Sequence, residues 1–255
     1  MNPKAQKLEA FSRLIDIMDE LREKCPWDKK QTFESLRHLT LEETYELSDA
    51  LLEGNLQEIK KELGDVLLHI VFYAKIGSET GSFDIADVIN SLNEKLIFRH
   101  PHIYGNVVAN DEETVKQNWE KLKLKEGNTS ILSGVPKGLP PMIKAYRIQD
   151  KVKGIGFDFP NAHEAWKKVE EELKEFHAET EAEKKEAELG DVFFSLINYV
   201  RTIGINADSA LEKTNLKFIS RFQHMEKIAQ KRNLILSEMS LDEMDQLWEE
   251  AKKYH

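Results

Sequence analysis

The feature that most constrains this chain is an internal repeat that spans most of its 255 residues. Four segments of the first half recur in the same order in the second half. They are EETYE at 42–46 with EELKE at 171–175, KELGDVLLHIVFYA at 61–74 with AELGDVFFSLINYV at 187–200, NEKLIFR at 93–99 with NLKFISR at 215–221, and QNWEKLK at 117–123 with QLWEEAK at 246–252. The order indicates a duplicated module of about 100 residues.

Helical spacing dominates both halves. Apolar residues recur every three or four positions, which is the period of a helix face. The segments with this spacing are 8–21, 36–52, 59–76, 85–98, 165–176, 186–203, 207–231 and 241–252. Strand-like alternation is not convincing anywhere, and the chain has only 12 glycines and 7 prolines. The sequence therefore predicts an all-α fold of two tandem helical bundle modules.

The clearest interruption is GNTSILSGVPKGLPP at 127–141, which holds three of the prolines. Proline lacks the amide hydrogen that a helix interior needs, so a continuous helix is excluded there. We expect a first module over 1–124, a linker over 125–150 and a second module over 151–255.

Composition and charge limit the partners. The net charge of −10 argues against binding to a DNA or RNA polymer, although metals can bridge acids to the phosphates of a nucleotide. The single cysteine, Cys25, excludes an internal disulfide framework and favours a reducing compartment. The N-terminus has no apolar signal core, and the apolar run 66–74 is too short to cross a membrane. We expect a cytoplasmic protein with no membrane contact.

Paired acids stand at helical spacing in both halves. Residues three or four apart share one face of a helix, so two such helices can converge four carboxylates. The second half offers Glu172, Glu175, Glu188 and Asp191, and the first half offers Glu43, Glu46, Glu62 and Asp65. Glutamate-rich helix faces are usually solvated, but Asp191 stands among apolar residues on a segment that is typical of a buried helix. Buried carboxylates require compensation, and Mg²⁺ is the divalent cation that this ligand type favours, with Mn²⁺ as the alternative.

Cations and aromatic residues follow the acids. Lys217 and Arg221 share a helix face, as do Lys95 and Arg99, and each pair is either a solvated face or a phosphate contact. Trp248 is either a packing residue or a platform for a base, and Lys168 is either a surface lysine or a further phosphate contact. His69 fits a core histidine better than a ligand, because the repeat has serine at that position.

At these residues the sequence resembles the MazG family of nucleoside triphosphate pyrophosphohydrolases, in its two-module bacterial form. The family pattern is EExxE, a spacer and ExxD. It occurs twice here, at Glu42–Glu46 with Glu62–Asp65 and at Glu171–Glu175 with Glu188–Asp191. The segments CPWDKKQT at 25–32, RHPHIYG at 99–105 and GIGFDF at 154–159 also resemble that form.

The resemblance implies an all-α bundle related to the all-α dimeric dUTPases and a homodimer. It also implies Mg²⁺-dependent hydrolysis of NTPs and dNTPs to the monophosphate and pyrophosphate, with broad base specificity. The resemblance implies that the second module, 151–255, carries the main nucleotide site. Carried onto this chain, the metal ligands are Glu172, Glu175, Glu188 and Asp191. Glu172 or Glu175 would orient a water that the metal ionises, and Lys168, Lys217, Arg221 and Trp248 would contact the nucleotide. The first module keeps a second metal site at Glu43, Glu46, Glu62 and Asp65, with phosphate contacts at Lys95 and Arg99.

Three alternatives remain open from sequence. A di-iron carboxylate bundle needs Glu-x-x-His motifs, whereas this chain has Asp at the last position. A non-catalytic helical interaction protein would carry the acids as surface charges. A narrower enzyme would hydrolyse a single nucleotide, such as dUTP, dCTP or a modified one.

Overall fold

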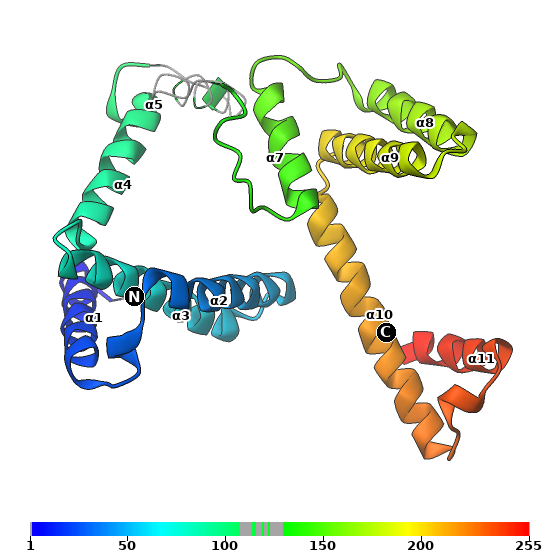
Figure 1. Cartoon of the computed structure of the whole chain (residues 1–255), viewed down its shortest axis with the longest axis horizontal. Coiled ribbons are helices and arrows are strands. Elements are labelled where there is room, and N and C mark those ends of the chain that lie inside the picture. The colour runs from blue at the N-terminus through cyan, green and yellow to red at the C-terminus, as the bar shows by residue number, and fades with distance from the viewer. Residues whose placement is uncertain (1, 108–113, 116–118, 120–121, 123–129, 255) are drawn as a thin grey trace. The chain divides into compact units, whose positions relative to one another are not determined.

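The chain is built from α-helices and short 3-10 turns in the computed structural model (Figure 1). The structure describes residues 2–107, 114, 115, 119, 122 and 130–254. No strand occurs within these ranges, which confirms the all-α prediction. No helix in the described part is both long and apolar enough to cross a membrane. The chain divides into two compact units, residues 1–109 and 110–255, and each is described by itself.

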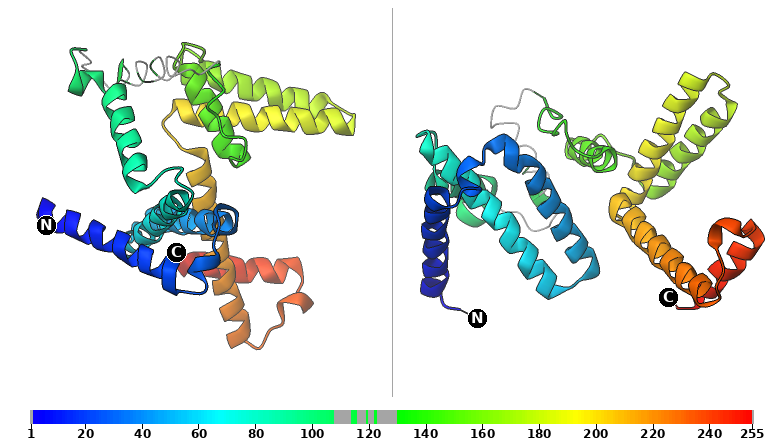
Figure 2. Two further views of the ribbon diagram at one scale, coloured as in Figure 1. Left: turned by 60° about the vertical axis from the view of Figure 1, so that its left-hand side comes forward. Right: turned by 60° about the horizontal axis from the view of Figure 1, so that its bottom comes forward.

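The first unit is organised around a hairpin of two long helices. Its helices are α1 (Lys4–Lys24), α2 (Phe33–Glu53), α3 (Leu56–Glu79), α4 (Ile85–Arg99) and α5 (Pro101–Tyr104). Gly54 ends α2 with φ 70°, a backbone conformation that favours glycine, and the Asn55 side chain caps the start of α3. The two helices therefore run antiparallel, side by side (Figure 2). The core of this unit joins α1, α2 and α3 through Met18, Leu36, Val71, Phe72 and Ile76.

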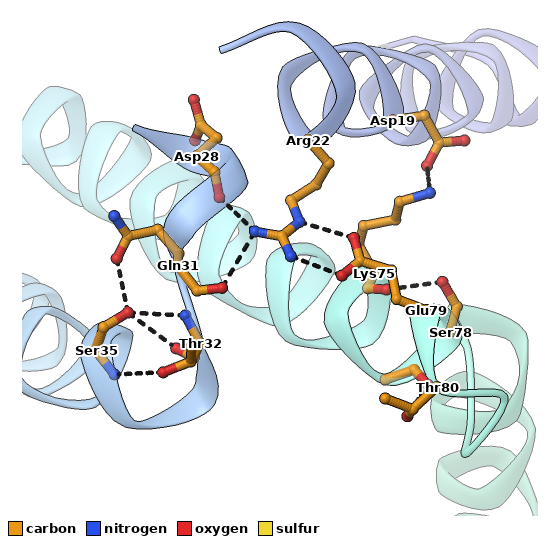
Figure 3. Close-up of polar contacts among 11 residues, drawn as sticks. Asp19, Arg22, Asp28, Gln31, Thr32, Ser35, Lys75, Ser78, Glu79 and Thr80 are labelled. Carbon is orange, nitrogen blue, oxygen red and sulfur yellow. Dashed lines mark hydrogen bonds and ion pairs between the residues drawn. The ribbon is translucent and has the colours of Figure 1, made fainter. Parts of the chain in front are cut away.

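Arg22 fixes the loop that precedes the hairpin (Figure 3). Its Nε and Nη2 donate to the two carboxylate oxygens of Glu79, at 2.8 and 2.6 Å. Its Nη1 donates to the backbone carbonyls of Asp28 and Gln31. The guanidinium thus ties loop 25–32 to the last turn of α3, and burial of the Arg22 side chain to 9% exposure strengthens these charged hydrogen bonds.

A capping box then sets the first turn of α2. The backbone N–H of Ser35 donates to Thr32 Oγ1 at 3.2 Å, and the backbone N–H of Thr32 donates to Ser35 Oγ at 2.8 Å. Ser35 Oγ also contacts the Gln31 side chain. The start of α2 is therefore held against the end of α3, which fixes the alignment of the helices that carry the acids.

The second unit repeats the hairpin. Its helices are α7 (Pro141–Lys153), α8 (Ala162–Ala178), α9 (Ala182–Thr202), α10 (Ala207–Lys231) and α11 (Leu241–Ala251). Helices α8 and α9 form the hairpin, and α7 packs on α9, where the Gln149 side chain donates to the Phe194 carbonyl at 2.8 Å. A separate core joins α10 and α11 through Met225, Ile228, Ala229, Leu247 and Ala251. Figures 1 and 2 show α10 leading away from the hairpin, with α11 against its far half.

The predicted linker over 125–150 overlaps a helix. Residues 141–150 belong to α7, which packs on α9 and α10 in the second unit. Pro141 occupies the first turn of α7, where a missing amide hydrogen removes no helix hydrogen bond. The predicted residue boundaries of the modules remain predictions, and residues 125–129 of the predicted linker lie outside the described residues.

Candidate active site

Three carboxylates of the second unit converge between neighbouring helices. Glu172 comes from α8, while Glu188 and Asp191 come from one face of α9. One oxygen from each lies within 4.8 Å of the others. Glu172 is buried, Glu188 is half-buried and Asp191 is exposed, so the cluster opens to solvent on one side.

The first unit builds the same group at the equivalent positions. Glu43 comes from α2, and Glu62 and Asp65 come from α3. These carboxylates also offer one oxygen each within 4.8 Å of one another, and here Glu62 is the buried member. The helix hairpin thus brings together, in each unit, three of the four acids that the repeat singles out.

The fourth acid of each set stands apart. Glu46 and Glu175 are exposed and lie outside the two close groups. Both remain near enough to act electrostatically. The pKa of Glu43 is raised, mainly by burial and to a smaller extent by repulsion from Asp65 and Glu46. Burial, followed by repulsion from Glu175 and Asp191, raises the pKa of Glu188.

A lysine contacts the buried acid of each group. Lys168 Nζ lies 2.8 Å from Glu172 Oε1 and 2.8 Å from Glu171 Oε1, and these hydrogen bonds raise the pKa of Lys168. Lys61 Nζ lies 2.7 Å from Glu62 Oε1, which raises the pKa of Lys61. Sequence reasoning singled out Lys168 but missed Lys61, whose only signal was its position next to Glu62.

The first group also contains an unsatisfied oxygen. The Glu62 side chain is only 5% exposed, and its Oε2 is buried without a hydrogen-bond partner. A buried carboxylate oxygen without a donor is costly unless a cation compensates it. Three carboxylates at this spacing supply the hard oxygen ligands that Mg²⁺ or Mn²⁺ takes. The residues present therefore fit a divalent cation.

A polar chain runs beside the acids of the first unit. His69 Nδ1 lies 2.9 Å from Thr40 Oγ1, which in turn lies 2.6 Å from the Tyr73 hydroxyl. Burial lowers the pKa of His69, and the opposing effect of Asp65 is smaller. The imidazole is buried and lies outside the close carboxylate group. Ser195 replaces it in the second unit and donates to the Val192 carbonyl at 3.0 Å.

Three of the four predicted nucleotide contacts, Lys217, Arg221 and Trp248, lie away from the acids, whereas Lys168 contacts Glu172. Trp248 on α11 packs against Phe218 on α10 with ring centroids 5.0 Å apart, and Lys217 and Arg221 flank Phe218 in the sequence. The acids stand in the first half of α9, whereas α10 begins beyond its end and leads away (Figure 1). Within one chain, the structure does not bring these residues to the acidic group.

The corresponding residues of the first unit are arranged similarly. Lys95 and Arg99 lie on α4, which follows the C-terminal end of α3, whereas Glu62 and Asp65 lie in the first half of α3. Trp119, the repeat counterpart of Trp248, stands in a segment that is largely outside the described residues.

The fold and the site define a class of protein: an all-α chain in which a helical hairpin with clustered carboxylates occurs twice. Comparison with known sequences identifies the family. Residues 31–104 match the family model described as the MazG nucleotide pyrophosphohydrolase domain. The chain is 42% identical over 247 residues to a Thermotoga maritima protein named nucleoside triphosphate pyrophosphohydrolase/pyrophosphatase MazG, covering 95% of each chain. It is 36% identical to the nucleoside triphosphate pyrophosphohydrolase of Escherichia coli K12, covering 96% of this chain and 98% of the relative.

A third relative is longer than this chain. The uncharacterized protein YabN of Bacillus subtilis is 43% identical over 252 residues, which cover 95% of this chain and 52% of YabN. The repeat, the helical hairpins and these identities agree. The chain belongs to the MazG family, as the doubled EExxE and ExxD motifs predicted.

Proposed function

We propose that this chain hydrolyses nucleoside triphosphates to the monophosphate and pyrophosphate, and that the α8–α9 acids carry the reaction. The observation that supports this most is the carboxylate group of Glu172, Glu188 and Asp191, with oxygens within 4.8 Å and one buried member. Relatives at 36% and 42% identity, aligned over nearly the whole chain, bear names of this activity. The first-unit acids form a second metal site whose part in turnover is secondary.

Magnesium is the proposed cofactor, and manganese is the proposed substitute. Glu172, Glu188 and Asp191 would hold it, joined by Glu175 if that exposed side chain turns inward. A bound divalent cation supplies a Lewis acid for phosphate oxygens and lowers the pKa of a water molecule. Glu175 or Glu172 orients the attacking water by accepting a hydrogen bond from it.

In this proposal the cationic residues bind the triphosphate and Trp248 binds the base. Lys168, Lys217 and Arg221 donate hydrogen bonds to phosphate oxygens and stabilise the charge that develops on pyrophosphate. Trp248 stacks on the base. This contact accepts any base, because every base has a flat aromatic face. Broad base specificity follows from a contact of this kind, and a single-nucleotide enzyme would need a polar base pocket in addition.

A homodimer completes the proposed site. In one chain the α10 residues lie away from the acids, so a second copy is needed to bring Lys217 and Arg221 to a carboxylate group. Large apolar side chains are exposed on the helices concerned, with Phe193 at 55% on α9 and Phe218 at 56% on α10. Their burial between two copies would remove this apolar surface from water.

The test is a hydrolysis assay with Mg²⁺ and each of the eight standard NTPs and dNTPs, resolving all phosphorus products. Monophosphate with pyrophosphate, from several bases, is the expected result. Diphosphate with phosphate would mean that the wrong bond is assigned. Turnover of one nucleotide alone would replace broad specificity with the narrower alternative. No turnover and no Mg²⁺-dependent change in melting temperature would favour the alternative of a non-catalytic helical interaction protein.

A further inference from the structure

We propose that Lys168 is an exchangeable counter-ion: its ammonium group occupies Glu172 in the metal-free protein and leaves when a divalent cation binds there. Once released, the same ammonium group is free to donate to a phosphate oxygen of the substrate. The proposal rests on the proposed function of the α8–α9 acids, and it adds an order of events at that site.

The contacts of Lys168 carry the first step. Its Nζ bridges Glu171 and Glu172, at 2.8 Å from one oxygen of each. Glu172 is the buried member of the group, with a side chain 9% exposed, whereas Glu171 is 56% exposed. The ammonium therefore neutralises the carboxylate whose unpaired burial would cost most. That carboxylate is also a member of the group that fits a divalent cation.

Competition follows from the number of charges and oxygens. A divalent cation placed among three carboxylates is attracted more strongly than a single ammonium on one of them. The cation and the ammonium repel each other at contact distance, so both cannot share Glu172 Oε1 at low cost. The Lys168 side chain is 36% exposed and sits on a flexible four-carbon stem, so it can swing away without unfolding α8.

The first unit shows what a non-exchanging arrangement looks like. Lys61 contacts Glu62 Oε1 at 2.7 Å, but Glu62 Oε2 is buried and unpartnered. A cation can therefore bind Oε2 while Lys61 keeps its contact. Leu39 stands where Lys168 stands in the second unit, as counted from the EExxE motif. Exchange is therefore proposed for the second unit, where one lysine is held by two acids and no lysine occupies the equivalent position of the first unit.

Exchange couples metal loading to substrate binding. While Lys168 holds Glu172 and Glu171, its ammonium is engaged by two carboxylates. Metal binding releases it and places a cation beside the position where the triphosphate docks. If metal binding tightens phosphate binding through Lys168, then phosphate binding must tighten metal binding by the same factor.

The test titrates Mn²⁺ alone into the full chain and compares Lys168→Met with wild type. Both carry Glu62→Gln and Asp65→Asn, so that only the second-unit site reports. We expect Lys168→Met to bind Mn²⁺ about three- to tenfold more tightly, because a competing cation is gone. Lys167→Met is the matched control. It removes one positive charge from the adjacent residue, whose partner is Glu164, 2.8 Å away and outside the acidic group. We expect it to leave Mn²⁺ affinity unchanged.

A labelling experiment on the otherwise wild-type chain provides the second readout. An amine-reactive reagent, followed by mass spectrometry, should modify Lys168 faster when Mg²⁺ is present, with Lys167 unchanged. Unchanged labelling of Lys168, or weaker Mn²⁺ binding in Lys168→Met, would overturn the exchange. Absence of Mn²⁺ binding in every variant would overturn the proposed metal site itself, so the two failures are distinguishable.

Discussion

The α2–α3 and α8–α9 hairpins place three carboxylates in the same arrangement but balance their charge differently. In the first unit, Lys61 satisfies one oxygen of buried Glu62 and leaves the other without a partner. In the second, Lys168 reaches from the preceding turn of α8 and bridges two acids. The duplicated motif therefore preserves the arrangement of the carboxylates but not their lysine contacts, and we propose that this difference alters how readily a cation enters.

The loops before the hairpins differ in a similar way. In the first unit, Arg22 reaches from α1 to Glu79 and to two carbonyls of loop 25–32 (Figure 3). In the second, Arg201 of α9 itself donates to Asp158 of the preceding loop at 2.6 Å. The second hairpin is therefore tied to its loop by a residue of α9, whereas the first is tied by a residue of α1. The two hairpins thus show that one loop position can be fixed by unrelated side chains.

Metal removal should have the largest effect and should distinguish the two hairpins. Chelation of divalent cations is expected to lower turnover by at least about a hundredfold, because even residues that support metal ligands account for 10–100-fold. Mn²⁺ added back to metal-free protein should fill two sites per chain. Turnover should follow only the site that Glu188→Gln removes. Recovery that follows the site removed by Glu62→Gln would reverse the assignment of the two hairpins.

Loss of the Arg22–Glu79 pair should destabilise the first unit at neutral pH. Glu79→Gln is expected to cost about 1 to 3 kcal/mol in the free energy of unfolding, because partly buried Arg22 loses its charged acceptor. The hydrogen bond from Arg22 lowers the pKa of Glu79 in the folded state. The stabilisation of the fold by this ion pair is therefore present above the unfolded-state pKa of Glu79, and it is lost as pH falls through the folded-state pKa of Glu79.

Denaturant melts of wild type and Glu79→Gln between pH 7 and pH 3 check this sign. The two curves should converge in acid. Glu20→Gln is the control, because its pair with Lys24 is largely exposed and should contribute little. A stability difference that persists undiminished at the lowest pH would remove the electrostatic explanation.

Substitution of Trp248 should weaken nucleotide binding without affecting the acids. Trp248→Ala is expected to raise KM about tenfold, which is the order of one base-stacking contact. Trp27→Ala, at a tryptophan of the first unit that is 54% exposed, should leave KM unchanged. Steady-state kinetics on both variants measure this. If Trp248→Ala lowers kcat at constant KM, the platform role fails and a packing role against Phe218 takes its place.

Neutralisation of a crowded acid should slightly stabilise the metal-free protein. Burial and neighbouring carboxylates raise the pKa of Glu43, so its ionised form is disfavoured in the folded state. This penalty is fully present above the folded-state pKa and absent below the unfolded-state pKa. Glu43→Gln should therefore raise Tm at pH 8 in chelator by about 2 °C. Glu188→Gln should shift Tm in the same direction. Melting curves that move downward in chelator would contradict the repulsion.

The repeat and the helical periodicity were enough to predict the all-α fold and the family, because both depend on local spacing. Glu172, Glu188 and Asp191 could be singled out because three-residue spacing places acids on one helix face. The partner of Lys168 could not be derived, since a lysine side chain can reach several acids at once. The separation of Trp248 from the acids was also missed, because periodicity does not give the direction in which α10 leaves the hairpin.

The most direct test compares matched variants, Glu172→Gln and Glu43→Gln, which remove the equivalent acid of each hairpin. Each purified protein is incubated with Mg²⁺ and a nucleoside triphosphate, and monophosphate and pyrophosphate are quantified. We expect Glu172→Gln to abolish product formation with its helical content unchanged, and Glu43→Gln to retain most of the product formation. Undiminished turnover in Glu172→Gln would contradict the assignment of the α8–α9 acids as the catalytic group.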